Sequence, residues 1–398
     1  MGSLVRIQYR PPFLEALMAA GPLRIGIVGV GTLTLRAILP HLTQPDLIDR
    51  VSVVALADPV IDRARDAAQH FGVPAAFPSV EALLADGGVD AVTIVSPIGL
   101  HFEHARAALQ AGKHVHINKT MTTTVAEADE LIQLAAEGGL RLVASPGEIL
   151  RPHVRRTREL ISDEAIGRLT WAICGAAFGR YHEQEPERSA AAGGAIDPSW
   201  YFRKPGGGPM YDMTVYALHQ LTSVLGPVLR VTALSGVRIP ERTFLERTVP
   251  TEADDNTVAL LDFGSGLVAV AYGTAAGGPI DQFGTGIYYG TQGTIDGGLL
   301  NGVPFELRGR HGSLTTPIGD EDAQNALLPH VLGEHRSIGE GHVFEDVMQL
   351  VDWILDGKAS PATAEHARHV IDIIESGYRA SETGVTQVLR TSFLPADD

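Results

Sequence analysis

The sequence is poor in cysteine, in long apolar runs and in positive charge. Its 398 residues include one cysteine, Cys174, so no disulfide can form within a chain. We expect a reducing, cytoplasmic compartment, and a core position for Cys174 in its apolar, strand-like run. No apolar stretch reaches the roughly 18 residues that a membrane-spanning helix needs. The formal net charge of −16 argues against nucleic acid and anionic membranes as partners.

The remaining composition is that of an ordinary globular protein. Hydrophobic residues make up 44% and charged residues 20% of the chain, whose length suits two or three domains. Residues 1–22 contain neither a sufficient apolar stretch nor an Ala-x-Ala cleavage site. We therefore expect a loosely packed N-terminal arm rather than a secretory signal.

From residue 23, short apolar strands alternate with helices. Such alternation requires crossover connections and predicts a parallel, doubly wound sheet. We therefore predict an α/β protein whose residues 23–147 form a Rossmann dinucleotide-binding domain. The expected strands are 25–28, 51–57, 91–95, 114–117 and 140–144, and the expected helices are 33–42, 61–71, 80–84, 101–111 and 125–137.

The alternation of strands and helices ends in residues 148–398, which we predict to be an α+β substrate-binding and oligomerisation domain. A large, mostly antiparallel open sheet is expected, because few helices interrupt the strand-like runs. Its own helices would cover one face, and a second subunit the other, giving a homodimer or homotetramer. The expected strands are 170–177, 230–234, 258–262, 267–272, 286–289 and 305–308, and the expected helices are 155–161, 343–355 and 364–378, the last with Thr363 as N-cap.

A glycine turn directly follows the first strand. Gly29-Val30-Gly31 matches the pattern that brings backbone amides to a pyrophosphate at a helix N-terminus. The third position of this fingerprint, usually Gly or Ala, is Thr34. The cofactor contacts predicted at the turn are Gly29, Gly31, Thr32 and Leu33.

Asp58 ends the second strand, 27 positions after Gly31. A carboxylate here can accept hydrogen bonds from ribose hydroxyls and repels a 2′-phosphate, which favours NAD over NADP. The alternative is that Asp58 is a turn aspartate before Pro59. Arg63 and Arg65 follow closely and leave NADP open.

Two further turns lie at strand ends, where ligands collect in a doubly wound sheet. Ser96-Pro97-Ile98-Gly99-Leu100-His101 could line the nicotinamide ribose, or His101 could be a solvent-facing helix start. Asn118-Lys119-Thr120 brings a lysine to the cofactor, whose oxidised nicotinamide would disfavour the protonated amine and suit it to proton exchange with a hydroxyl. His114 and His116 share a strand face, but no third ligand accompanies them, so we expect no metal.

Residues 206–219 bring three proton-handling side chains together. A helix that starts near Pro209 carries Asp212, Tyr216 and His219 at i, i+4 and i+7, hence on one face. Such a face is either a substrate wall or plain polar surface.

These segments in this order resemble the glucose–fructose oxidoreductase/inositol dehydrogenase (Gfo/Idh/MocA) family over roughly residues 23–384. The family's Glu-Lys-Pro motif is similar to Asn118-Lys119-Thr120, and its Thr-Pro-x-x-x-His turn to Ser96–His101. Its Gly-Gly-Gly…Asp-x-Gly-x-His/Tyr segment resembles Gly206–Tyr216, with Thr214 at the usual glycine.

The resemblance implies that the substrate lies in a cleft between the two domains. Lys119 would assist proton transfer, Asp212 would hold substrate hydroxyls, and Arg151 would lie near the substrate. Tyr216 stands where the family has His or Tyr, and would need a cation such as Lys119 to act as a base, because a free phenol titrates at about pH 10. His219 titrates naturally near neutrality. We rank these candidates as Lys119, then Tyr216, then His219.

The segment Trp200-Tyr201-Phe202-Arg203-Lys204 precedes the glycines. Its aromatic rings could stack on a sugar and its cations could bind hydroxyls or a carboxylate, or it could be a surface loop that packs its own aromatics. The predicted substrate contacts are thus Asp212, Arg151, Tyr201 and Arg203.

Together these features predict an NAD(P)-dependent oxidoreductase. It would transfer a hydride, without a metal, between nicotinamide and a secondary alcohol or ketone of a sugar, inositol or sugar derivative. One alternative is a glycoside-cleaving enzyme that uses tightly held NAD for transient oxidation. The other is a non-catalytic, cofactor-sensing regulator, which the presence of the lysine and of the polar helix face disfavours.

Overall fold

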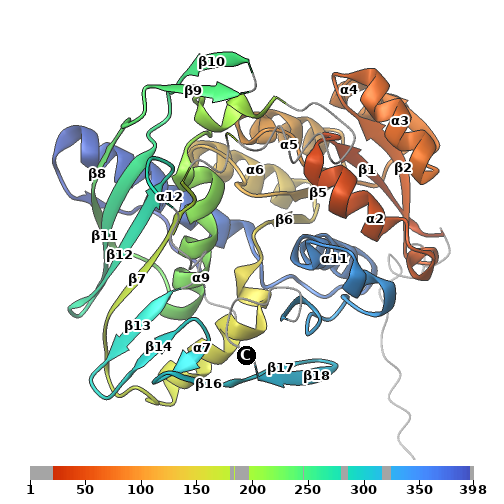
Figure 1. The fold of residues 1–398 in the computed structure, drawn as a ribbon. Coiled ribbons are helices and arrows are strands. Elements are labelled where there is room, and N and C mark those ends of the chain that lie inside the picture. Colours follow the sequence, from red (N-terminus) through yellow and green to blue (C-terminus); the bar gives the residue numbers. More distant parts are fainter. Residues whose placement is uncertain are drawn as a thin grey trace, which may run out of the picture.

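Two β-sheets with helices between and around them organise the chain (Figure 1). The computed structural model describes residues 21–179, 183, 197–244, 246–278, 286–315 and 324–394. Residues 1–20 of the predicted N-terminal arm lie outside the described residues. No helix in the described ranges has the length and apolar character needed to cross a bilayer.

The first sheet is a Rossmann sheet, as predicted. Its six strands are all parallel and follow the order β3-β2-β1-β4-β5-β6. The order reverses between β1 and β4, so the carboxyl ends of these two strands open a crevice. The strands are β1 (Leu23–Val28), β2 (Val51–Ala57), β3 (Ala75–Phe77), β4 (Ala91–Ile94), β5 (His114–Ile117) and β6 (Leu142–Ala144).

The helices of this half lie close to their predicted positions. The predicted helix at 33–42 contains a π-helical segment, η1 (Thr34–Ile38), followed by α2 (Leu39–Leu42). The others are α3 (Ile61–Phe71), α4 (Val80–Asp86), α5 (His101–Gln110) and α6 (Val125–Glu137).

The second sheet is large, open and mostly antiparallel, which confirms the predicted fold class. Its order is β16-β15-β14-β13-β7-β12-β11-β8-β19, and among these neighbours only β7 and β12 are parallel. Its strands are β7 (Leu169–Ala177), β8 (Arg230–Gly236), β11 (Asn256–Gly264), β12 (Leu267–Thr274), β13 (Ile287–Gly290), β14 (Thr294–Asp296), β15 (Leu299–Leu300), β16 (Val303–Pro304) and β19 (Gln387–Val388).

Two hairpins stand outside this sheet. The strand predicted at 305–308 is β17 (Glu306–Gly309), which pairs with β18 (Gly312–Thr315) and not with the large sheet. The other hairpin joins β9 (Glu241–Phe244) to β10 (Arg247–Pro250). Cys174 lies buried in β7, and burial raises the pKa of its thiol to about 12.

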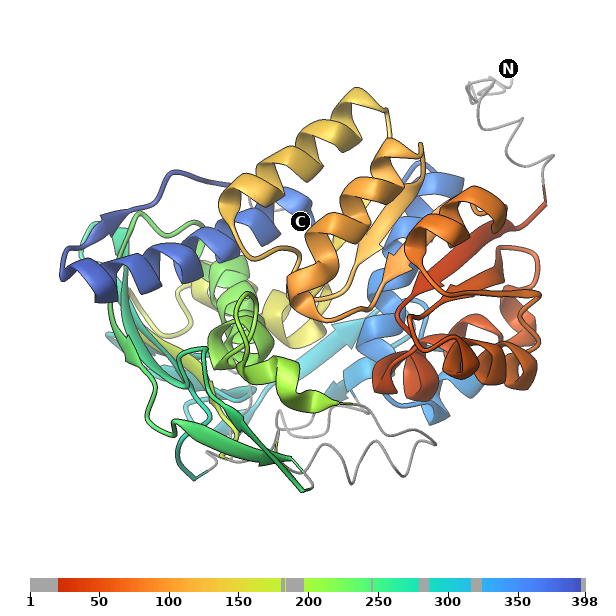
Figure 2. The ribbon, with the colours of Figure 1, turned by 90° about the horizontal axis from the view of Figure 1, so that it is seen from above.

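One long helix is shared by both sheets. The helix α12 (Ala364–Thr383) begins at Thr363, whose side chain accepts a hydrogen bond from the His366 amide and so forms the predicted N-cap. Val370 and Ile374 pack into the core of the large sheet, whereas Ile371 packs into the core of the first sheet with β4, β5 and α6. Figure 2 shows α12 between the two layers.

A second late helix completes the first sheet. In α11 (Gly341–Leu355), Phe344 and Val347 share one apolar core with Leu23, Ile25 and Ile27 of β1. Residues far beyond position 147 therefore fill one face of the Rossmann half.

The outer face of the large sheet is apolar and exposed. Leu234 is 80% exposed and lies opposite Val258, which is 49% exposed. Trp171 stacks on its cross-strand neighbour Tyr289 with ring centroids 4.4 Å apart. Such a surface, with Leu260 also 52% exposed, is typical of a protein–protein interface, and it is the face that the predicted homo-oligomer would bury.

We expect the protein to scatter light as a dimer or larger, and Leu260→Glu to shift it toward a monomer. A carboxylate buried without a partner costs several kcal/mol or more, on the order of 5 kcal/mol. Ile48→Glu is the control, because Ile48 is 70% exposed but lies outside this sheet. A wild-type monomer at micromolar concentration would contradict the expectation.

Candidate active site

A cavity of about 1050 Å³ is lined by both halves of the chain. The first half contributes the turns that follow β1, β2, β4 and β5, and the second half contributes α9 (Val215–Leu225), the turn between β14 and β15, and the start of α11. This volume lies at the upper end of the range for small-molecule and cofactor sites. The cavity is therefore the natural place for the predicted site residues.

The glycine turn after β1 has the shape that a dinucleotide requires. Gly29 has φ +97°, and a Cβ atom there would lie 2.8 Å from the Ser96 nitrogen, so the turn closes against the end of β4. A Cβ atom at Gly31 would meet nothing within 4 Å. Gly29, Gly31, Thr32 and Leu33 all line the cavity. Open space at the start of a helix fits a pyrophosphate.

Asp58 both shapes the turn and lines the cavity. Its carboxylate accepts hydrogen bonds from the Val30 amide at 2.9 Å and the Val60 amide at 2.8 Å. Arg63 donates to it at 2.8 Å and also lines the cavity, whereas Arg65 pairs with exposed Asp62 instead. Both of the roles considered for Asp58 are thus compatible, and Arg63 is the one of the two arginines that lines the cavity.

His101 is buried rather than solvent-facing, which corrects one of the two interpretations of this residue. Its ring nitrogens lie 2.7 Å from the carbonyl oxygens of Ser96 and Thr120. Burial lowers its pKa to about 4, so the neutral ring donates to one of these carbonyls at a time. His101 therefore joins the turn after β4 to the turn after β5. It lines the cavity together with Ser96, Pro97, Asn118 and Lys119.

The loop after β5 is held against the second half of the chain. Lys119 Nζ lies 2.5 Å from Oδ1 of Asp212 and also donates to the Asp212 carbonyl. The Thr120 hydroxyl donates to the Tyr211 carbonyl at 2.6 Å, and the Tyr211 hydroxyl donates to the Thr123 carbonyl at 2.6 Å. These contacts give Lys119 a defined position in the cavity wall.

The helix predicted near Pro209 begins as a π-helix, η7 (Met210–Thr214), and continues as α9. Asp212 and Tyr216 line the cavity, with the Tyr216 ring centroid 5.3 Å from Lys119 Nζ. Burial raises the pKa of Tyr216 well above its usual value. A π-helical turn bonds i to i+5, so the regular α-helical alignment of 212, 216 and 219 does not hold across it.

His219 is not among the residues that line the cavity. It is 3% exposed and lies with its ring centroid 4.7 Å from that of His366. Burial lowers its pKa to about 3, so it stays neutral at physiological pH. The expectation that His219 titrates near neutrality is therefore wrong.

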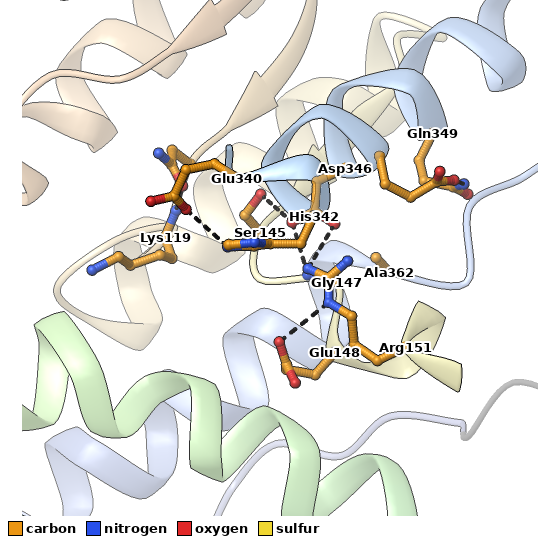
Figure 3. Close-up of polar contacts among 12 residues, drawn as sticks. Lys119, Ser145, Gly147, Glu148, Arg151, Glu340, His342, Asp346, Gln349 and Ala362 are labelled. Atoms are coloured by element: carbon orange, nitrogen blue, oxygen red, sulfur yellow. Dashed lines mark hydrogen bonds and ion pairs between the residues drawn. The ribbon is translucent and has the colours of Figure 1, made fainter. Parts of the chain in front are cut away.

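Arg151 lies in a buried charge cluster beside the cavity (Figure 3). Its guanidinium is 3.5 Å from Glu148 and 3.4 Å from Asp346 of α11. Asp346 also accepts hydrogen bonds from the Ser145 hydroxyl at 2.8 Å and the Gly147 amide at 3.0 Å. Nη1 of Arg151 is buried without a hydrogen-bond partner, so it remains able to donate to a ligand.

The aromatic segment before the glycines is divided by the fold. Tyr201 lines the cavity, and its ring lies 4.0 Å from that of Trp200. Arg203 is exposed and does not line the cavity, because the short helix η6 (Pro198–Phe202) ends just before it. The structure thus does not bring Arg203 to the other predicted contacts.

His114 and His116 have protein partners. His114 accepts a hydrogen bond from the Arg141 amide at 2.9 Å. His116 lies between the hydroxyls of Thr93, at 2.6 Å, and Ser145, at 3.0 Å. Across the described ranges no three His, Cys, Asp or Glu side chains are grouped as a metal site would require.

The cavity residues missed from the sequence include Arg36, Glu340 and His342. Arg36, from η1, forms an ion pair with Glu340, and His342 lies one residue inside α11. The available signal was Gly339-Glu340-Gly341-His342, a polar and glycine-rich run just before an amphipathic helix. This run was not recognised as part of the site because it lies far along the chain from the cofactor turns and no sequence motif links the two.

Comparison with known proteins identifies the family. A model described as "Oxidoreductase family, NAD-binding Rossmann fold" matches residues 23–145, and the "GFO/IDH/MocA C-terminal domain" matches residues 154–296. The chain belongs to the Gfo/Idh/MocA oxidoreductase family. The two matched ranges thus lie on either side of the loop that carries Arg151.

Two related proteins show how similar this Gfo/Idh/MocA chain is to others in sequence. It is 25% identical to scyllo-inositol 2-dehydrogenase (NADP(+)) IolW of Bacillus subtilis, over 92% of this chain and 96% of that protein. It is 34% identical to dTDP-3,4-didehydro-2,6-dideoxy-alpha-D-glucose 3-reductase of Streptomyces violaceoruber. The second match spans about half of each protein, 52% of this chain and 56% of the reductase.

Solved structures share the fold over nearly the whole chain. A levoglucosan dehydrogenase in complex with NADH and levoglucosan matches with a TM-score of 0.72 and 19% identity, over 93% of this chain and 100% of that one. The WlbA dehydrogenase of Bordetella pertussis, in complex with NADH and UDP-GlcNAcA, matches with a TM-score of 0.70 and 21% identity, over 94% and 99%.

Gly31→Val should weaken NADH binding by at least about tenfold, or about 1.4 kcal/mol, without lowering the unfolding temperature. The new side chain would occupy the open space of the turn and meet no protein atom near its Cβ. Calorimetric titration and thermal unfolding measure the two effects. Gly312→Val is the matched control, because Gly312 is equally unobstructed but lies in the β17–β18 hairpin. Wild-type affinity in Gly31→Val would contradict the turn's role.

Asp58→Ser should shift cofactor preference toward NADP by about tenfold or more, because it removes the repulsion between this carboxylate and the 2′-phosphate of NADP. A tenfold change in affinity corresponds to about 1.4 kcal/mol. The substitution also leaves Arg63 without its carboxylate partner. Calorimetric titrations with NAD and NADP measure the ratio. Asp62→Ser removes an exposed carboxylate from the same region and should leave the ratio unchanged. An unchanged ratio in Asp58→Ser would show that this carboxylate does not discriminate.

Proposed function

We propose that the protein is an NAD(P)-dependent dehydrogenase that oxidises a secondary alcohol of a sugar, inositol or sugar derivative, or reduces the corresponding ketone. The observation that carries the proposal is the Lys119–Asp212–Tyr216 group, which shares one cavity with the glycine turn and Asp58. The names of the relatives and structural neighbours, which include inositol, levoglucosan and nucleotide sugars, support a polyhydroxylated substrate.

Bound nicotinamide would supply the hydride acceptor, or the donor in the reverse direction. The residues that would hold the dinucleotide are those of the glycine turn for its pyrophosphate, Asp58 for its adenosine ribose, and Ser96 and Pro97 for its nicotinamide ribose. Asp58 favours NAD, and Arg63 beside it can accept a 2′-phosphate, so we propose that NAD is preferred and NADP tolerated.

Lys119 is the residue that would exchange the proton with the reacting hydroxyl. Its ammonium group can donate to the substrate oxygen and stabilise the negative charge that develops there, which general acid–base catalysis requires. Asp212 accepts a hydrogen bond from the same ammonium and fixes its direction. The carboxylate, as an acceptor, would also bind a substrate hydroxyl. The substrate oxygen would thus be held where Lys119 and Asp212 meet.

Tyr216 would act as a wall and hydrogen-bond donor rather than as a base. Its ring lies 5.3 Å from the Lys119 ammonium, a cation–π distance, and burial raises the pKa of its hydroxyl well above 10. A phenol that keeps its proton can donate to a substrate oxygen. Arg151 Nη1 and Tyr201 complete the proposed contacts to the substrate.

The regulatory alternative has less support, because Lys119, Asp212 and Tyr216 all line the same cavity. A screen of sugars, inositols and sugar acids with NAD and NADP in parallel tests the proposal, with absorbance of the reduced cofactor as the readout. Oxidation of at least one polyol is expected. A complete lack of turnover, or of cofactor binding, would remove the proposed function.

Lys119→Met should lower kcat/KM by about 100-fold to 10,000-fold, the usual contribution of a positioned acid–base group. The methionine keeps the length of the side chain but carries no charge. Lys113→Met is the matched control, because Lys113 precedes β5 at the opposite end of the strand and does not line the cavity. In the same assay, near-normal turnover of Tyr216→Phe would remove the Tyr216 hydroxyl from the chemistry.

A further inference from the structure

The proposed reaction releases a proton on oxidation, and several nearby groups are poorly suited to receive it. Burial raises the pKa of Tyr216 far above neutrality and lowers that of His219 to about 3. Burial also lowers the pKa of His101 to about 4, and both of its nitrogens face backbone carbonyls. His104 lines the cavity, but burial lowers its pKa too, and it bonds the Ser96 hydroxyl at 3.0 Å.

The start of α11 contributes a different kind of histidine. His342 lies in the cavity wall with its side chain 11% exposed, and its Nε2 is 3.4 Å from a carboxylate oxygen of Glu340 (Figure 3). Glu340 precedes the helix with φ +62°, and its other carboxylate oxygen pairs with Arg36. The Glu340 carboxylate beside His342 favours the imidazolium form.

His342 also contacts one residue of the proposed reaction centre, Tyr216. Its ring meets the Tyr216 ring edge-on, with centroids 6.2 Å apart, and Tyr216 in turn covers the Lys119 ammonium. Among the described residues, the titratable and charged groups near the imidazole include Glu340 at the start of α11, Arg36 of η1 through Glu340, Tyr216 of α9, and His41 of α2, on which His342 acts electrostatically.

We propose that His342, held by Glu340, is the proton-relay residue of this site. The proposal rests on the proposed function and adds a residue to it. In the oxidation, the substrate O–H bond breaks and its proton moves to Lys119 as the Lys119 ammonium gives up one of its own protons, which passes through water in the cavity to the His342 imidazole. The C–H bond breaks with its electron pair, which leaves as hydride to the nicotinamide, and the C=O bond forms. Glu340 stabilises the imidazolium until its proton reaches water.

The first test is the pH dependence of kcat/KM for oxidation. A neutral imidazole is needed to receive the proton, so wild-type kcat/KM should fall as pH drops through the histidine range of about pH 8 to about pH 5. His342→Gln should lose about 100-fold or more at pH 7, within the usual range for acid–base groups, and should lose this acidic limb. Added imidazole should restore His342→Ala in proportion to its neutral form, which a purely structural role would not produce.

His311→Gln is the matched control. His311 is exposed in the turn between β17 and β18, so the same chemical change there should leave the rate and the pH profile unchanged. An active wild type whose rate and acidic limb survive in His342→Gln would overturn the relay and leave the proposed function standing. If the wild type oxidises no substrate, the proposed function fails and the relay fails with it.

The second test does not depend on turnover. The Cε1–H resonance of His342, assigned by its loss in His342→Gln, is followed by NMR as pH changes. It should titrate between about pH 5 and about pH 8, where a histidine changes charge. Glu340→Gln removes the stabilising carboxylate and should lower this midpoint. A resonance that does not titrate in this range, or a midpoint unchanged in Glu340→Gln, would overturn the proposal even if a substrate is found.

Discussion

Apolar packing on two sides of α12 holds the two sheets in one arrangement. Val370 and Ile374 are buried against the large sheet, and Ile371, next to Val370 in sequence, is buried against the first. An α-helix turns through about 100° per residue, so neighbouring positions serve different faces. A shift of this helix would disturb both cores at once. The distance between the glycine turn and the Tyr216 wall therefore depends on contacts that no substrate or cofactor provides.

Two charge pairs of the cavity connect the two halves of the chain. Lys119 pairs with Asp212, and Arg36 pairs with Glu340, so each pair joins the first half of the chain to the second. A buried charge such as that of Asp212 is costly unless a partner compensates it, and its partner Lys119 comes from an element that only the folded chain brings close. The same pairs that orient the proposed catalytic groups thus also depend on the correct docking of the two sheets.

Much of the framework was predictable because it is recorded in local patterns. The bounds of β2 and α6 agree with their predicted ranges, since a strand buried on both faces is a continuous apolar run and α6 shows clear helical spacing. Two-residue strands such as β15 have no room for a pattern. The strand-end positions of Lys119 and Asp58 followed from the alternation of strands and helices.

The remaining parts of the site depend on contacts between distant positions. His219 was assigned from regular α-helical spacing, which the π-helical turn at 210–214 breaks. His342 lies 126 positions after Tyr216, and only the folding of α11 onto the first sheet brings their rings together. No periodicity or residue spacing within a short segment of the sequence indicates such a contact.

The contribution of α11 to the first core has a consequence for the order in which the protein folds during synthesis. Val28 at the end of β1 and Gly341 at the start of α11 are 313 positions apart. The ribosome therefore releases all six strands of the first sheet long before the helix that covers one of its faces. Until α11 and α12 emerge, that apolar face is open to water and to chaperones, and the dinucleotide half can finish its own core only after nearly the whole chain has been made.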